Sequence, residues 1–221
     1  MCGRFSLDAL PNTLAQHFGL NEAPALQPRD NIAPSQDIAV IRLRGREREC
    51  ALLRWGLVPA WSREPKTRYS TINARAETVA EKPAYRNAFR QRRCLIPATG
   101  FYEWQKTPDG KVPYHIVPLD ELWAFAGLWE RWEKGDEPLE TFTILTTEAA
   151  QSIEQIHPRM PTILEPAEYD AWLELDTGKD DLAQLAGKQF PDARMRAYPV
   201  NTRVNTPKND DAELIEEMGA A

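Results

Sequence analysis

Between residues 37 and 148 the chain contains a series of short apolar segments that are rich in β-branched and aromatic residues. Most of these segments are separated by Gly, Pro or Asp, a pattern typical of strands bounded by turns. Because strand-like segments mostly follow one another instead of alternating with helices, we expect an α+β fold with a largely antiparallel, barrel-like β core. The segments lie at 37–43, 49–59, 94–106, 113–119, 122–132 and 140–148.

Helical patterns lie mostly outside this region, and we expect the helices on the periphery of the β core. A further helix, interrupted near Pro83, is predicted at 76–91. No internal repeat, low-complexity tract or long linker divides the 221 residues. We therefore predict one domain over residues 1–221, with about the last ten residues as a tail. The other predicted helices lie at 8–18, 148–156, 165–175, 181–190 and 211–218.

The three cysteines, at positions 2, 50 and 94, show no Cys-x-x-Cys spacing. This argues against a disulfide framework or a structural zinc site, and we expect neither a metal nor another cofactor. Cys50 and Cys94 lie in strand-like segments and are predicted to be core residues. No apolar run approaches the roughly 18 residues of a membrane span, and the signal-peptide pattern is missing. We expect a cytoplasmic protein with no membrane partner.

The charge is distributed unevenly along the chain. Residues 42–93 hold 14 of the 27 Lys and Arg and have a formal net charge of +9, whereas the rest of the chain has −15. Such asymmetry suits a cationic surface for a phosphate backbone on an acidic body. Charge alone is equally compatible with solvated side chains that do not cluster in space.

The chain begins with the sequence MCGRF. A small second residue favours removal of Met1, which would leave Cys2 with its thiol and its α-amine on adjacent carbons. If the segment is extended, Cys2 and Arg4 point to the same side, and Gly3 lets a ligand approach closely. The alternative is an inert terminus.

Two further segments place polar residues where packing does not require them. Asn73 and Arg75 share a face if their segment is extended, and together they could hold a sugar and a phosphate. His157 and Arg159 share a face in a loop stiffened by two prolines. The alternative for the first segment is an Asn in a turn beside an Arg on the surface. The alternative for the second is a His with a structural role.

Glu103 lies between Tyr102 and Trp104 in a predicted strand. Alternation places Phe101, Glu103 and Gln105 on one face and the two other aromatic residues on the opposite face. Burial would raise the pKa of this carboxyl group and make it a proton donor near neutral pH. The alternative is a Glu that faces solvent or pairs with an arginine.

A mature N-terminal cysteine has a specific reactivity. Its α-amine titrates near pH 8, so part of it is neutral at pH 7 and condenses with an aldehyde to a Schiff base. The neighbouring thiol then closes onto the same carbon to give a thiazolidine, and the intramolecular geometry favours this step. The opened sugar of an abasic site in DNA is such an aldehyde, and its phosphates would explain the arginines.

These segments together resemble the SRAP (SOS response-associated peptidase) family, in family order and over essentially the whole chain. The resemblance implies a protein that covalently traps abasic sites in single-stranded DNA through its N-terminal cysteine. The motifs that carry it are MCGRF, DNIAPSQ (30–36), LRWGLVPAW (53–61), INARAET (72–78), RCLIPATGFYEW (93–104), FAGLWE (125–130), TILTTEA (143–149), IHPRMP (156–161) and VNTRVNTPKND (200–210).

The resemblance also implies roles for single residues. Cys2 resembles the crosslinking residue, Asn73 the group that positions the amine and the opened sugar, Glu103 the acid–base group, and His157 its partner beside the sugar and phosphate. The implied DNA contacts are Arg4 and Arg75 as phosphate clamps, joined by Arg159, and Pro34, Trp61, Trp104 and Thr146 lining the cleft. The chain departs from the family at Asp30, where an aromatic residue is common, and at Pro158, where a polar one is common.

The principal expectation is a monomeric DNA-damage-response protein, nucleoid-associated on damage, that acts on single-stranded DNA. A lyase side activity is conceivable, because a Schiff base at an abasic site can proceed to β-elimination. One rival is a cysteine peptidase or hydrolase with Cys2 as the nucleophile and His157 as the base. Another is a non-covalent single-strand-binding module in which Cys2 is incidental.

Overall fold

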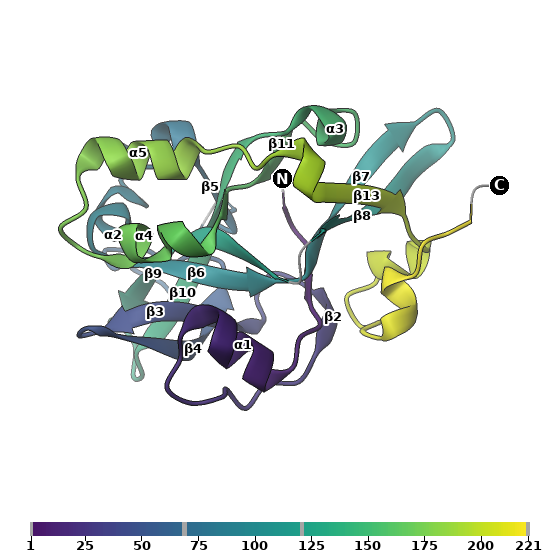
Figure 1. The fold of residues 1–221 in the computed structure, drawn as a ribbon. Helices are drawn as coiled ribbons and strands as arrows, with labels where there is room; N and C mark the ends of the chain where they lie inside the picture. Colours follow the sequence, from purple (N-terminus) through teal and green to yellow (C-terminus); the bar gives the residue numbers. More distant parts are fainter. Residues whose placement is uncertain (1, 68–69, 120–121, 220–221) are drawn as a thin grey trace.

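The computed structural model describes residues 2–67, 70–119 and 122–219, which form two β-sheets with short helices around them (Figure 1). Strands dominate the element order, as the repeated apolar segments predict. The strands are β1 (Phe5–Leu7), β2 (Arg29–Ile32), β3 (Asp37–Arg44), β4 (Glu47–Trp55), β5 (Asn73–Arg75), β6 (Arg93–Ala98), β7 (Gly100–Thr107), β8 (Gly110–Pro118), β9 (Trp123–Trp132), β10 (Leu139–Glu148), β11 (Arg159–Pro161), β12 (Ile163–Leu164) and β13 (Met195–Pro199).

Five strands of the larger sheet close into a barrel. The pairing runs β10–β4–β3–β6–β9 and returns from β9 to β10. Every pair in this ring is antiparallel except β4–β10, which is parallel. Aromatic side chains such as Trp55 and Phe142 fill the barrel. Phe5 of β1 packs edge-on against Trp55, with the two ring centres 5.2 Å apart. The predicted α+β fold with a barrel-like core is confirmed.

The smaller sheet has the order β13–β8–β7–β1–β2 and lies to the right in Figure 1. The single strand predicted at 94–106 is in fact two strands, because the chain leaves the barrel after β6 and enters the smaller sheet as β7. Gly100 lies at this transition. A Cβ atom there would clash with the ring of His115 and the carbonyl of Ile116, so only glycine allows this close approach.

The helices are short and lie outside the sheets. Pro11 opens the first one, later than predicted, and Gly19 ends it in the left-handed conformation. The predicted break near Pro83 is present, with a 3-10 turn before it and α2 after it. The helices are α1 (Pro11–Phe18), α2 (Arg86–Gln91), α3 (Gln151–Glu154), α4 (Tyr169–Leu173) and α5 (Lys179–Gly187), with 3-10 turns η1 (Ala76–Thr78), η2 (Pro166–Glu168), η3 (Asp192–Arg194), η4 (Thr202–Asn205) and η5 (Ala212–Ile215).

Two expectations about the C-terminal residues are wrong. The helix predicted at 211–218 is a single 3-10 turn, because a segment this short takes its shape from tertiary contacts. These residues also pack instead of forming a tail: Leu214 is fully buried, and the amide of Met218 donates to the carbonyl of Pro199 at 2.9 Å. Of the two cysteines predicted in the core, Cys94 is buried and Cys50 is half-buried.

Candidate functional site

Cys2 is inserted into the protein and is not exposed. Its side chain is fully buried, and its carbonyl accepts a hydrogen bond from Nδ2 of Asn73 at 2.8 Å. Its Sγ donates to the carbonyl of Arg4 at 3.8 Å. The segment that follows enters the smaller sheet, because Phe5 pairs with both β2 and β7. Cys2 is therefore held between the two sheets, near Asn73 of β5 and Glu103 of β7.

Glu103 of β7 faces this junction and is only 4% exposed. Burial raises the pKa of the Glu103 carboxyl group, as the sequence suggested it would. Burial also raises the pKa of the Cys2 thiol, and the charge of Glu103 adds to this effect. The Glu103 carboxyl group therefore lies close enough to the Cys2 thiol for its charge to act on that thiol.

His157 reaches the same point from the loop before β11. Its Nδ1 lies 3.8 Å from Oε1 of Glu103 and accepts from the backbone amide of Arg159 at 3.1 Å. The antiparallel pairing of β11 with β10 sets the position of this loop. The structure thus brings together Cys2, Asn73, Glu103 and His157, which come from four distant parts of the chain.

Asn73 is held by hydrogen bonds of its backbone and of the nitrogen of its side-chain amide. Strand β5 pairs in parallel with β10, and the hydroxyl of Tyr85 donates to the carbonyl of Asn73 at 3.3 Å. Nδ2 is used by Cys2, whereas Oδ1 is buried and has no hydrogen-bond partner among the described residues. This oxygen is an acceptor available to a ligand amine or hydroxyl group.

A cavity of about 590 Å³ opens beside Asn73. Its wall includes two aromatic side chains, Trp61 and Tyr85, and two cations, Arg75 and Lys82. Trp61 is 55% exposed, and its Nε1 donates to the carbonyl of Pro83 at 3.3 Å. Aromatic surfaces combined with cations are what sequence-tolerant binding of a single nucleic-acid strand requires.

Arg4 and Trp104 lie on the other side of Cys2, over the smaller sheet. The guanidinium carbon of Arg4 is 5.9 Å from the centre of the Trp104 ring. Nη1 of Arg4 donates to Oδ1 of Asn31 at 2.7 Å and to the carbonyl of Val204 at 2.6 Å. Burial lowers the pKa of Arg4 from its usual value. Arg4 is therefore a half-buried cation in a fixed orientation.

The other implied DNA contacts differ in their surroundings. Arg159 makes two bonds to the carboxylate of Glu77, at 2.5 and 3.1 Å, so a phosphate would have to displace this partner. Thr146 is fully buried in β10 beneath these residues, and its hydroxyl has no partner within the described part of the chain. Pro34 lies in the turn after β2 and is outside the residues that line the cavity.

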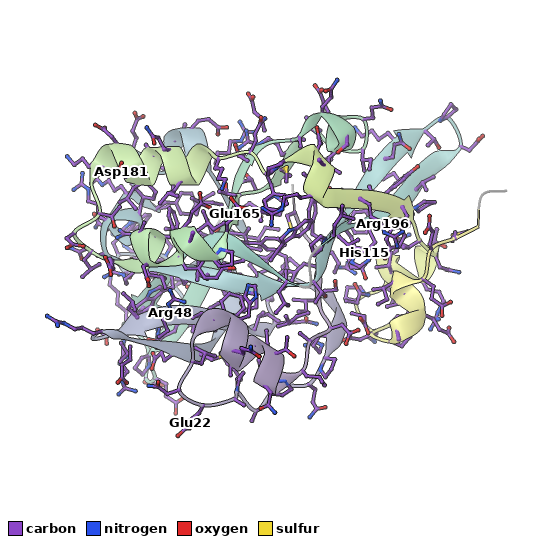
Figure 2. All side chains as sticks on the ribbon, viewed as in Figure 1. Glu22, Arg48, His115, Glu165, Asp181 and Arg196 are labelled. Carbon is purple, nitrogen blue, oxygen red and sulfur yellow. The ribbon has the colours of Figure 1, made fainter. Side chains whose placement is uncertain are left out.

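Several arginines of the basic stretch 42–93 are paired with carboxylates or buried. Arg42 pairs with Glu49 and Glu140 at 2.7 and 3.1 Å, and Arg48, labelled in Figure 2, pairs with Asp170 at 2.6 Å. Arg92 pairs with Glu130, and Arg93 is buried and donates only to backbone carbonyls among the described residues. Within the stretch, it is Arg75 and Lys82 that bring positive charge to the cavity.

In residues 2–67, 70–119 and 122–219, no group of three or more His, Cys, Asp or Glu side chains is arranged to hold a metal ion. Across the same described ranges, no helix has the length and apolar character needed to cross a membrane.

The family model named "SOS response associated peptidase (SRAP)" matches residues 1–207. The chain belongs to the SRAP family. It is 40% identical to "Abasic site processing protein YoqW" of Bacillus subtilis, over 98% of this chain and 99% of the relative. It is also 32% identical to "Abasic site processing protein HMCES" of Gallus gallus, over 88% of this chain and 63% of that longer protein.

Solved structures show the same fold. A crystal structure of a protein from Bacteroides thetaiotaomicron matches with a TM-score of 0.88 at 28% identity, over 98% of this chain and all of that one. A protein from Bordetella bronchiseptica matches with a TM-score of 0.79 at 27% identity, over 90% of this chain. The SRAP fold therefore extends over nearly the whole length of the chain.

The structure adds residues that sequence reasoning missed. Lys82 and Tyr85 join the cavity because the turn at Pro83 folds back toward β5. Glu77 lies in the first turn of η1 and is also the ion-pair partner of Arg159. Asn31 lies inside the motif DNIAPSQ, so its position in that motif was the available signal.

Proposed function

We propose that this SRAP protein processes abasic sites in single-stranded DNA by a covalent link between Cys2 and the opened sugar. The observation that carries the proposal is the setting of Cys2: its carbonyl is bound by Asn73, and its thiol lies within the electrostatic influence of Glu103. The names of the relatives, which are abasic site processing proteins, support the part of the proposal that concerns abasic sites. Removal of Met1 precedes the chemistry, because the α-amine of Cys2 must be free.

The reaction joins an aldehyde, an amine and a thiol with loss of one water molecule. The α-amine adds to the aldehyde carbon of the opened sugar, and Glu103 protonates the resulting hydroxyl group so that it leaves as water. The product is an iminium ion. The thiol then gives its proton to the Glu103 carboxylate, a C–S bond forms at the iminium carbon, and the C=N electron pair returns to nitrogen. The thiazolidine closes intramolecularly, which favours it strongly.

A raised pKa suits Glu103 to both proton transfers. A carboxyl group whose pKa is raised holds its proton more readily than an ordinary glutamate, so it can first donate a proton and then accept one. His157, with Nδ1 at 3.8 Å from the carboxylate, stabilises the ionised form. Oδ1 of Asn73 accepts a hydrogen bond from the amine or from a sugar hydroxyl, which orients the reacting groups.

DNA binding in this proposal involves residues on both sides of Cys2. Arg75 and Trp61 act in the cavity beside Asn73, where the ring stacks on a base and the cation faces a phosphate. Arg4 and Trp104 act on the other side. Arg159 contributes a phosphate contact only after a phosphate displaces Glu77. Pro34 lines the surrounding surface, and buried Thr146 supports it from β10.

The rival activity of a cysteine peptidase is less well supported. An activated catalytic cysteine needs a lowered thiol pKa, but burial raises the pKa of Cys2. The aminothiol reaction does not need a preformed thiolate, because Glu103 can take the proton as the ring closes. β-Elimination from the Schiff base is a side reaction with which this closure competes.

The decisive experiment incubates the protein with uracil-containing single-stranded DNA and uracil glycosylase, followed by a denaturing gel. We expect a heat-resistant shifted band without borohydride, lost in Cys2→Ala and retained in the matched variant Cys50→Ala. Intact mass should show the loss of Met1 and an adduct mass lower by one water molecule than the sum of its parts. Absence of a band with the wild type contradicts the proposal. Peptide hydrolysis that is lost in Cys2→Ala supports the peptidase.

We further propose that residues 1–221 act as one domain and as a monomer in the cytoplasm, gathering at the nucleoid after damage. Size-exclusion chromatography with light scattering measures the oligomeric state. Imaging of a fluorescent fusion before and after DNA damage measures the location in the cell. The fusion partner belongs at the C-terminus, since the chemistry requires a free Cys2 amine.

A further inference from the structure

Asn31 joins the N-terminal and C-terminal segments of the chain. This side chain is fully buried, and its Oδ1 accepts a hydrogen bond from Nη1 of Arg4 at 2.7 Å. Its Nδ2 donates to three backbone carbonyls of the C-terminal segment: Val204 at 3.2 Å, Thr206 at 3.2 Å and Asn209 at 2.7 Å. One amide group therefore links Arg4 to residues 204–209.

Asp210 fixes the backbone on which Asn31 is placed. Its Oδ1 accepts from the amides of Asp30 and Asn31 at 2.7 and 2.9 Å, and its Oδ2 pairs with Arg29. The C-terminal segment is thus tied to β2 through both side chains and backbone. Asp210 lies beyond the residues 1–207 that the family model matches.

The same segment contacts the side chains that flank Cys2. The carbonyl of Val204 accepts the second hydrogen bond from Nη1 of Arg4, and Oδ1 of Asn205 accepts one from Nε1 of Trp104 at 2.7 Å. Both hydrogen bonds from the Arg4 side chain to described residues come from Nη1. The guanidinium plane is therefore held at one end, over the ring of Trp104.

We propose that residues 201–210 form a positioning element for DNA binding, with Asn31 and Asp210 as positioning residues that act through Arg4. This inference rests on the proposed function, because it requires a phosphate of a single strand at Arg4. An arginine side chain loses much rotamer freedom when it binds a phosphate. Holding it in one orientation beforehand reduces this cost and increases affinity. The motif VNTRVNTPKND thereby has a role in binding, although it lies far along the chain from Cys2.

Salt dependence of binding distinguishes this role from a merely structural one. Each phosphate contact to single-stranded DNA contributes about 0.7 to the slope of log affinity against log salt concentration. We would measure binding of an undamaged single-stranded oligonucleotide by fluorescence anisotropy in a Cys2→Ala background, so that no covalent product forms. We expect Arg4→Ala to reduce the slope by about 0.7 and Asn31→Ala to reduce it by nearly as much. The double variant should lose no more than Arg4→Ala alone.

A matched pair of variants covers the case in which Asn31→Ala does not fold. Asp210→Asn and Glu213→Gln each remove one negative charge from the C-terminal part of the chain. Asp210 binds the backbone of β2, whereas Glu213 pairs with Arg203. We expect Asp210→Asn to weaken binding and lower the slope, and Glu213→Gln to leave both unchanged. Circular dichroism and the unfolding midpoint show which variants are folded.

Four results separate the possible failures. The inference is overturned if Arg4→Ala lowers the slope while folded Asn31→Ala and Asp210→Asn keep it, or if the losses from Arg4→Ala and Asn31→Ala add. It is also overturned if Arg4→Ala leaves the slope unchanged. If the parent protein does not bind the single strand in a salt-dependent way, the proposed function fails with it.

Discussion

The two faces of strand β7 carry two groups of polar residues with opposite properties. On one face, Glu103 lies beside His157, Cys2 and Asn73, and the His157 side chain is 26% exposed. On the other face, Tyr102 stacks on His115, which is 2% exposed and whose ring nitrogens lie 3.0 Å from Oγ of Ser6 and 3.1 Å from the hydroxyl of Tyr198. Figure 2 shows His115 against the smaller sheet, next to Arg196.

The residue types are similar, but the chemistry they allow is different. A serine, a histidine and a tyrosine in a hydrogen-bonded chain resemble catalytic machinery, yet each of these groups is buried and uses its hydrogen bonds within the protein. Burial lowers the pKa of His115 to about 3, so its ring stays neutral. The group around Glu103 combines a buried acid with access, through Asn73, to a cavity. Access and unused hydrogen-bonding capacity, not residue type, distinguish a site from a core network.

We call the face of β7 that carries Glu103 the open face and the face that carries Tyr102 the closed face. The largest effect should come from Glu103 on the open face. Glu103→Gln removes the proton donor and acceptor while keeping the shape of the side chain. We expect the rate of adduct formation to fall about 10³-fold, close to 4 kcal/mol in the barrier. Time courses on denaturing gels measure this rate. His115→Gln is the control on the opposite face, and a comparable loss of rate in its folded fraction would break the distinction between the two faces.

The closed face should dominate stability instead. His115→Ala leaves the hydroxyls of Ser6 and Tyr198 without their partner and opens a cavity beneath Tyr102, and we expect a loss of about 3 kcal/mol in the free energy of unfolding. His157→Ala, at a partly exposed position, should cost less than about 0.5 kcal/mol. Urea denaturation of both variants measures the difference. Equal losses would contradict the assignment of His115 to a structural role.

The pH dependence of stability should also identify the closed face. The pKa of His115 is about 3 in the folded chain and about 6.5 in the unfolded chain, so only the unfolded chain binds the proton between these values. Stability is therefore complete above pH 6.5 and falls below it, by about 2 kcal/mol at pH 5. Asp30, whose pKa burial raises to about 6, acts in the opposite direction in this range. The difference between wild type and His115→Gln isolates the histidine, and parallel pH curves would refute its contribution.

The smallest effect should come from Ser6. Ser6→Ala removes one buried hydrogen bond to His115 but leaves the ring bonded to Tyr198, so we expect a loss of about 1 kcal/mol. The rate of adduct formation per folded molecule should not change. Denaturation and the gel assay on the same preparation measure both quantities. A slower reaction would show that the two faces of β7 are coupled.

Much of the fold could be predicted because its signals are local. Alternating apolar segments bounded by turn residues predicted the main strands of the barrel, and Pro83 marked the break in the helical segment. The transition at Gly100 was not predictable in this way, since the strand-like pattern continues from 94 to 106 and only the approach of His115 shows why the chain changes sheets. The 3-10 turn at Ala212–Ile215 was missed for the same reason, because buried Leu214 and not local propensity determines it.

The candidate site divides in the same way. The sequence alone determined which residues stand out: a cysteine behind the initiator methionine, a carboxylate between two aromatic residues, and a histidine in a proline-stiffened loop. The tertiary structure decided their surroundings, because burial, the 3.8 Å approach of His157 to Glu103 and the pairing of Arg159 with Glu77 depend on strands far apart in the chain. It also placed hydrogen-bond partners around His115 and Asn31. A sequence records which groups are present, whereas pKa, access and partners arise only when folding excludes water and fixes distances.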